Sequence, residues 1–87
     1  MGDPLQPIEI EIQGERASQL GEAGRRIERA LAALGTDEDS LHEAATAVWY
    51  YMIIRESLGM YDHKAAFAIY GVPAQVMARV GVIRKTG

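Results

Sequence analysis

The chain has 87 residues with a net charge of −3, two histidines and no cysteine, and 48% of its residues are hydrophobic. This length predicts one domain over residues 1–87. The lack of cysteine excludes disulfides and thiolate metal sites. The net negative charge disfavours general affinity for nucleic acid or anionic membranes. A domain this small buries only about two thirds of its unfolded surface. Oligomerisation is therefore the stabilising device that the composition leaves open.

Neither an export signal nor a membrane span is visible. The first residues, Met1-Gly2-Asp3-Pro4, lack the basic start and the apolar run of a signal peptide. The uncharged apolar run from Ala44 to Ile54 is too short to cross a bilayer. We therefore expect a cytoplasmic protein without a membrane segment.

An apolar stripe with heptad spacing predicts one long helix over about residues 5–34. Its members are separated alternately by three and four residues, and charged residues fill the intervening positions. The stripe consists of Ile10, Gln13, Ala17, Leu20, Gly24, Ile27, Leu31 and Leu34. Pro4 and Pro7 fit the first turn of such a helix, where a missing amide hydrogen is tolerated.

Two features of this segment complicate the prediction of one helix. Residues 8–12 alternate strictly between isoleucine and glutamate, which is typical of a strand, but the heptad spacing continues through them and no partner strand is visible. Gly14, Gly21 and Gly24 each weaken a helix by about 1 kcal/mol relative to alanine. They indicate either weak local order or the close packing of another backbone, and both interpretations stay open.

The second predicted helix begins at Leu41 and ends near Leu58. Gly35 ends the first helix, and Ser40 with Glu43 forms a capping box. Gly59 is suited to the left-handed conformation that terminates a helix. Residues 48–54 are apolar in every direction around the helix axis, which is typical of a helix enclosed by partners.

Two short helices are predicted to follow, over about residues 63–70 and 73–80. Asp62 is a suitable N-cap for the first of them, which stops at Gly71. Pro73 opens the second, which ends at Gly81 and leaves a frayed tail over residues 82–87. The predicted fold is all-α, with a long N-terminal helix packed on a buried second helix and two short C-terminal helices.

The length of the first helix indicates self-association. A helix of about 30 residues is about 45 Å long, and the shorter helices do not cover its apolar stripe while also enclosing the second helix. We expect a second copy to cover the remainder, since large exposed apolar patches are unusual on monomers. The alternative is a first helix that breaks near Gly14 or Gly21 and folds back. The predicted homodimer interface comprises Ile10, Ala17, Leu20, Gly24, Ile27, Leu31, Trp49, Tyr50 and Met52.

The sequence offers no recognisable catalytic, cofactor or metal site, and we expect no enzyme. His42 and His63 are each placed in a first helical turn and are expected to be exposed, without the spacing of a helical metal site. The serines lack the context of a nucleophile elbow, and the glycines form no phosphate-binding loop. The aromatic residues of the second helix indicate core or interface rather than a ligand pocket. The chain is best interpreted as a self-associating interaction or accessory protein, with another protein as a second possible partner.

Charged residues on both sides of the turn after the second helix leave two interpretations open. If the turn brings them together, they form an ion-pair cluster that fixes the second helix against the third; otherwise they form a solvated corner. The residues concerned are Arg55, Glu56, Asp62, His63 and Lys64.

A helix-turn-helix resemblance in residues 63–80 gives the alternative function, a DNA-binding regulator. Gly71 and Val72 match its turn, and Met77 and Val80 match the two buried residues of its second helix. Phe67 occupies a position that is normally small, and the net negative charge opposes phosphate binding. In this alternative the DNA contacts are Gln75, Arg79, Arg84 and Lys85.

Three stretches of the chain are similar to a family of small bacterial proteins of unknown function. They are residues 15–34, which include Leu20-Gly21-Glu22-Ala23-Gly24-Arg25-Arg26, residues 41–59, which include Trp49-Tyr50 and Arg55-Glu56, and Tyr70-Gly71-Val72-Pro73. The resemblance implies a bacterial, all-helical protein, and it implies no activity or site residues.

Overall fold

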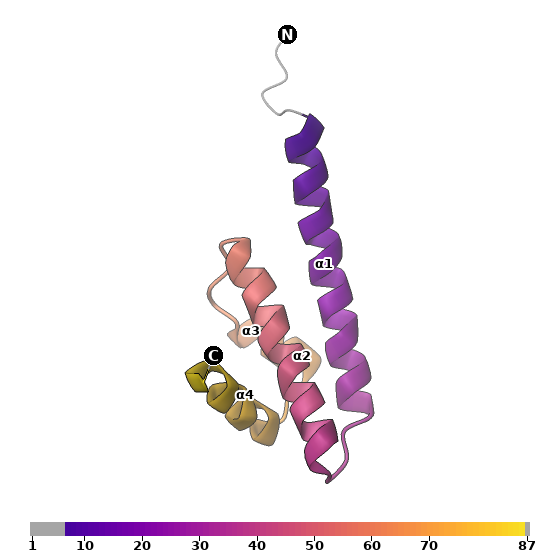
Figure 1. The fold of residues 1–87 in the computed structure, drawn as a ribbon, viewed down its shortest axis with the longest axis vertical. Helices are drawn as coiled ribbons and strands as arrows, with labels where there is room; N and C mark the ends of the chain where they lie inside the picture. Colours follow the sequence, from indigo (N-terminus) through magenta and orange to yellow (C-terminus); the bar gives the residue numbers. More distant parts are fainter. Residues whose placement is uncertain (1–6, 87) are drawn as a thin grey trace.

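The computed structural model describes the backbone of residues 7–86 and the side chains of residues 18–85. This part of the chain forms four helices and no strand, as Figure 1 shows. The helices are α1 (Pro7–Ala32), α2 (Glu38–Ser57), α3 (Lys64–Tyr70) and α4 (Ala74–Thr86). The predicted all-α fold, with a long first helix packed on the second, is confirmed.

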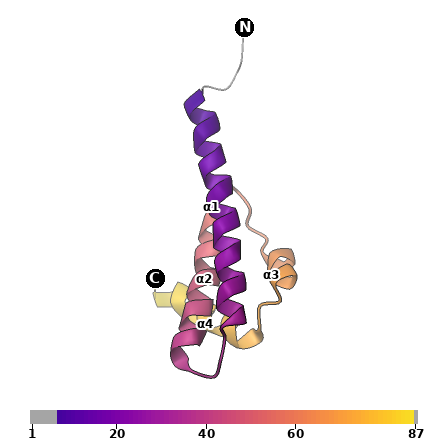
Figure 2. The same cartoon turned by 90° about the vertical axis from the view of Figure 1, so that its right-hand side faces the viewer.

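Helix α2 lies at the centre of the arrangement and contacts both α1 and α4. Helices α1 and α2 form an antiparallel pair, and the N-terminal part of α1 continues beyond the far end of α2 (Figures 1 and 2). Helix α1 is continuous through Gly14 and Gly21. The alternative in which the first helix breaks there and folds back is therefore wrong.

Small residues form much of the buried core. The alanines among them allow the helix backbones to approach closely, and Ile27, Val48, Val76 and Val80 fill the space between the helices at 2% exposure or less. The core side chains are those of Ala23, Ile27, Ala30, Ala44, Ala45, Ala47, Val48, Tyr51, Met52, Ile54, Ala66, Val76 and Val80. They come from all four helices, so the described part of the chain shares one core.

Helix α2 begins three residues earlier than the capping box predicted. Asp37 is the N-cap, and its carboxylate accepts a hydrogen bond from the Ser40 backbone N–H at 2.8 Å. That bond is the main reason why the pKa of Asp37 lies below its ordinary value. The Ser40 hydroxyl instead accepts from the backbone N–H of Gly35 at 3.0 Å, so it ties the loop to the first turn.

Two of the four predicted glycine terminators, Gly59 and Gly71, are confirmed, whereas α1 already ends at Ala32, before Gly35. Gly59 follows α2 with φ +82°, and the backbone N–H of Met60 donates to the carbonyl of Arg55 at 2.9 Å. Gly71 ends α3 with φ +65°. Both glycines adopt left-handed φ values that other residues rarely accept, which is why the chain reverses at these points.

The predicted ends of the last two helices need correction. Helix α3 begins at Lys64, whose backbone N–H donates to Asp62 Oδ1 at 3.2 Å. Helix α4 does not stop at Gly81 but continues to Thr86. The continuation allows Ile83 to pack against the core and Arg84 to reach Glu56 on α2, and these contacts outweigh the weak helix propensity of one glycine.

No helix in the described part of the chain is long and apolar enough to cross a membrane.

Candidate functional site

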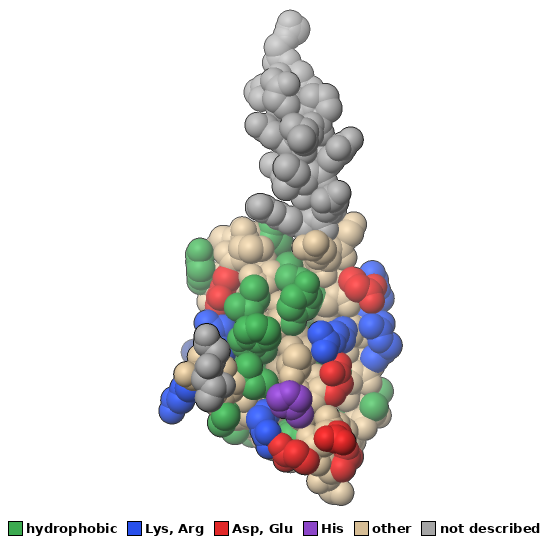
Figure 3. Space-filling view, in the orientation of Figure 1, with side chains coloured by type: hydrophobic (Ala, Val, Ile, Leu, Met, Phe, Trp, Pro, Cys, Tyr) green, Lys and Arg blue, Asp and Glu red, His purple; other side chains and the backbone are tan. Residues whose placement is uncertain are grey.

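One side of α2 faces solvent although it carries large apolar side chains. Tyr50 is 43% exposed and Ile53 is 40% exposed, and Trp49 beside them is half-buried. We call these three residues the outer α2 face. Figure 3 shows hydrophobic side chains gathered over α2, with charged side chains along the border of the patch.

A shallow groove between α1 and α2 adjoins the outer α2 face at Tyr50. Its volume is about 150 Å³. It is lined by Gln19, Glu22, Ala23, Arg26, Arg29 and Tyr50. Ala23 and Tyr50 contribute apolar surface to the groove, and the other four lining residues have polar or charged ends.

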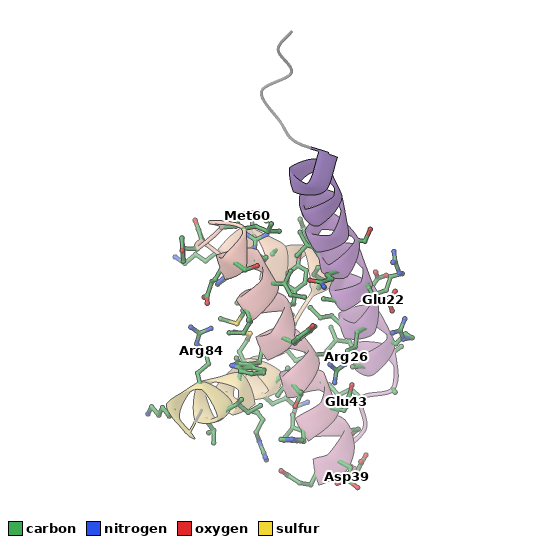
Figure 4. The ribbon with its side chains drawn as sticks, turned by 45° about the horizontal axis from the view of Figure 1, so that its top comes forward. Glu22, Arg26, Asp39, Glu43, Met60 and Arg84 are labelled. Atoms are coloured by element: carbon green, nitrogen blue, oxygen red, sulfur yellow. The ribbon has the colours of Figure 1, made fainter. Side chains whose placement is uncertain are left out.

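The charges along the rim of this groove neutralise one another. Arg26 reaches across from α1 to Glu43 on α2 (Figure 4), with contacts of 2.9 and 3.1 Å that lower the pKa of Glu43 and raise that of Arg26. Glu22 accepts hydrogen bonds from Arg25 and Arg29, and these bonds hold the pKa of Glu22 below its ordinary value. The face therefore presents apolar side chains inside a border of paired charges.

The residues predicted for a homodimer interface fall into three groups. Gly24, Ile27 and Met52 are buried inside the chain's own core, so they are not accessible to a partner in this fold. Leu20, Leu31 and Trp49 are half-buried, and Tyr50 is exposed. The side chains of Ile10 and Ala17 lie outside the described residues. Dimer formation itself stays a prediction. Ile53 is an exposed apolar residue of α2 that the predicted interface did not include, because an apolar run in every direction does not show which of its residues stay uncovered.

Gly24 is buried by contact with tyrosine side chains rather than by another backbone. A Cβ atom at this position would lie 3.1 Å from Tyr70 Cζ and closer still to the Tyr70 hydroxyl. The rings of Tyr70 and Tyr51 pack edge to face with centroids 5.4 Å apart. Burial, together with Tyr51, raises the pKa of Tyr70. The glycine therefore makes room for the end of α3 to dock on α1.

The charged turn after α2 forms a connected cluster rather than a solvated corner. Arg55 Nε donates to His63 Nδ1 at 3.1 Å, and His63 Nε2 lies 3.0 Å from Glu56 Oε2. Arg84 reaches from α4 toward α2 (Figure 4) and lies 3.5 Å from the same Glu56 oxygen. We call Arg55, Glu56, His63 and Arg84 the polar corner.

The prediction that both histidines are exposed is correct for His42 and wrong for His63. The His63 side chain is only 9% exposed because Arg55 and Glu56 hold its two nitrogens and the Phe67 ring packs against it, with ring centroids 5.7 Å apart. The predicted ion-pair cluster also lacked Arg84, which the sequence analysis assigned to a frayed tail. Lys64 is exposed and contributes only its backbone N–H to the turn.

Nothing in the described part of the chain favours the helix-turn-helix alternative. The two fully buried residues of α4 are Val76 and Val80, four positions apart, whereas Met77 is half-buried. Arg79 pairs with Glu38, and Arg84 pairs with Glu56. Two of the four predicted DNA contacts are therefore occupied in ion pairs within the chain. The other two, Gln75 and Lys85, are exposed.

Among the described residues, no group of three or more histidine, aspartate or glutamate side chains is placed to hold a metal ion. The expectation that the chain has no cofactor stays a prediction.

The fold and the outer α2 face define a small helical protein with a solvent-facing apolar surface. The chain belongs to a family of unknown function, DUF6665, whose profile matches residues 4–87. No curated protein and no solved structure matches the chain. The resemblance to an uncharacterised family is thereby confirmed.

Proposed function

We propose that this chain is a non-catalytic, self-associating protein of the cytoplasm, a homodimer in which the outer α2 faces of two copies pack together. The observation that carries the proposal is the exposure of Tyr50 and Ile53 within residues 48–54, a stretch of α2 that is apolar in every direction. Helices α1 and α4 cover only part of its circumference. A helix of this composition is typically enclosed on all sides, so the open side fits a partner surface.

Two properties of the face favour a second copy as the partner. Its border charges are paired within the chain, through Arg26 with Glu43 and through Glu22 with Arg25 and Arg29, so two identical faces meet without unpaired like charges. The groove beside Tyr50, with a volume of about 150 Å³, is a concave feature next to the exposed apolar side chains. A two-fold contact would therefore place an apolar side chain of each copy in the groove of the other.

The primary test compares two exposed isoleucines. Ile53 lies on the outer α2 face, whereas Ile69 lies on α3, on the other side of α2 in Figures 1 and 2, and is 80% exposed. Sedimentation velocity should show a wild-type mass of twice the 9.5 kDa chain. Ile53→Lys should raise the Kd of the dimer at least about tenfold. Burying the lysine charge in the interface costs more than about 1.4 kcal/mol of binding free energy, which corresponds to that factor. Ile69→Lys, the matched control, should leave the dimer intact.

Trp49 provides a second measurement because it is the only tryptophan in the chain. Its fluorescence emission should shift to longer wavelength as wild-type protein is diluted through the dissociation range, and Ile53→Lys should show the shifted emission at every concentration. A wild-type chain that stays monomeric at high concentration, or equal effects of the two lysine variants, contradicts the proposal.

A further inference from the structure

The polar corner contains a histidine whose proton is positioned by its neighbours. An arginine guanidinium stays protonated in proteins and offers only donors. Arg55 Nε, 3.1 Å from His63 Nδ1, therefore requires a lone pair on that nitrogen. The single proton of the neutral imidazole then lies on Nε2 and is donated to Glu56 Oε2 at 3.0 Å. The corner thus fits the neutral ring in one tautomer.

We propose that His63 is a proton-sensitive latch between α2 and α3. It holds α3 against the end of α2 while its imidazole is neutral, and it releases α3 when the ring takes up a second proton, at Nδ1. This regulation of α3 goes beyond the proposed self-association and does not depend on it. The latch joins two helices because His63 immediately precedes α3, whereas Arg55 and Glu56 belong to the last turn of α2.

A second proton would oppose the existing contacts directly. It would place an N–H group against the N–H group of Arg55 and bring two cations within hydrogen-bonding distance of each other. Among the described residues, Glu56 is the one carboxylate bound to the ring and so the charge placed to offset this repulsion, and it is shared with Arg84 of α4 at 3.5 Å. In the loop before α3, Asp62 binds Arg55 Nη2 through its backbone carbonyl at 2.8 Å, and its carboxylate accepts from the backbone of Lys64.

The other charged groups of the cluster keep their charge in mild acid. The hydrogen bond with His63 and the charge of Arg84 hold the pKa of Glu56 below its ordinary value, so this carboxylate stays ionised between pH 5 and pH 8. Imidazoles take up their second proton within that range. Mild acid should therefore remove the contact from Arg55 while the rest of the cluster keeps its charge.

Helix α3 is the element that the latch controls. It has seven residues, too few to be stable without tertiary contacts. Its first turn is attached through His63, whose carbonyl accepts from the Phe67 backbone at 3.0 Å and whose ring packs on the Phe67 ring. Loss of the contact from Arg55 weakens the attachment of this end, which then depends on the bond to Glu56, while Tyr70 still holds the other end against Gly24.

The first experiment uses the wild-type chain labelled with ¹⁵N at histidine. Long-range ¹H–¹⁵N spectra at pH 8 should show His63 with its proton on Nε2 and none on Nδ1. Titration to pH 5 should show protonation of Nδ1 together with a loss of amide protection in α3 that exceeds the loss in α1 and α2. A ring that carries its proton on Nδ1 at pH 8, or protection in α3 that is unchanged after His63 is protonated, overturns the proposal.

The second experiment compares His63→Gln with His42→Gln by thermal unfolding. The glutamine amide offers an acceptor for Arg55 and a donor for Glu56 but does not titrate. The wild type and His42→Gln, which changes an exposed histidine, should each lose about 4–8 °C in melting temperature from pH 8 to pH 5, the shift expected for one lost hydrogen bond in a domain of this size. His63→Gln should stay level over that range. An equal fall in all three proteins, or a level wild type, overturns the proposal.

Discussion

The two sides of α2 are similar in hydrophobicity but opposite in environment. The inner side carries alanines with Val48, Tyr51 and Ile54, which pack into the core, whereas the outer side carries Trp49, Tyr50 and Ile53. Adjacent isoleucines illustrate the difference, because Ile54 is 6% exposed and Ile53 is 40% exposed. Alanines lie where backbones approach each other, but the buried Tyr51 and Ile54 are as large as the exposed Tyr50 and Ile53. Position around the helix, rather than side-chain type, distinguishes the covered side from the open one.

The sharpest test of this difference truncates each of the two isoleucines. Ile54→Ala should reduce the free energy of unfolding by about 2–5 kcal/mol because it leaves a cavity in the core. Ile53→Ala, measured at a concentration where the chain is monomeric, should change it by less than about 0.5 kcal/mol. Urea denaturation followed by circular dichroism gives both values. Equal losses would show that the two sides do not differ in packing.

The next largest effect on the free energy of unfolding is expected at Gly24 of α1, which contacts Tyr70. Gly24→Ala forces Tyr70 to move, and overpacking of this kind costs about 1–3 kcal/mol, more than the gain of about 1 kcal/mol in helix propensity. The matched control, Gly21→Ala, meets nothing closer than 3.7 Å and should be stabilising. A Tyr70→Phe background should relieve part of the loss at Gly24. If both alanine variants stabilise equally, Tyr70 does not depend on this glycine.

A smaller effect is expected at the cap that fixes where α2 begins. The pKa of Asp37 is lowered in the folded chain, chiefly by the Ser40 backbone N–H, so its contribution is present above the unfolded pKa and is lost as the pH falls through the folded value. Asp37→Ala should therefore lower the melting temperature at pH 7, and the difference from wild type should shrink below pH 4. Asp37→Asn, which retains a capping oxygen, is the control. A difference that persists in acid argues against the charged cap.

The smallest effect belongs to the ion pair at the edge between the two sides of α2. Arg26 and Glu43 keep 35% and 53% of their side-chain surface exposed, so solvent screens their attraction. A double-mutant cycle with Arg26→Met and Glu43→Gln should give a coupling of about 0–1 kcal/mol that decreases with added salt. The value should be compared with the more exposed Glu22–Arg25 pair. A coupling well above this range would make the pair a main support of the α1–α2 contact.

Local signals in the sequence predicted the order and type of the helices, because glycine terminators act through their own backbone. Gly59 and Gly71 are the clearest examples. The start of α2 was harder to predict, because Asp37 and Ser40 both suit an N-cap. In the structure Asp37 takes that position, and the Ser40 hydroxyl binds the Gly35 backbone instead. The predicted end of α4 at Gly81 was wrong for a tertiary reason. Ile83 packs against the core, and this contact keeps the chain helical beyond the glycine.

The candidate site was only partly predictable, because a helix that is apolar in every direction does not reveal which side is covered. The heptad stripe identified residues of α1 that meet an apolar surface, but Ile27 meets the chain's own core. The burial of His63 required the loop of residues 58–63 to place it beside Arg55, and no local pattern encodes that approach. Tertiary contacts, rather than helix propensities, decide which side of α2 is covered and whether His63 is buried.

The position of Tyr70 beside Gly24 has a consequence for the order in which the chain folds. The site that receives this ring is formed by Gly24 on α1 and by Tyr51 on α2, so it does not exist until those two helices have met. Before that event, helix α3 has its attachment to α2 at His63 but no site for Tyr70. The pairing of α1 with α2 is therefore a precondition for the docking of Tyr70, which completes the contact of α3 with α1.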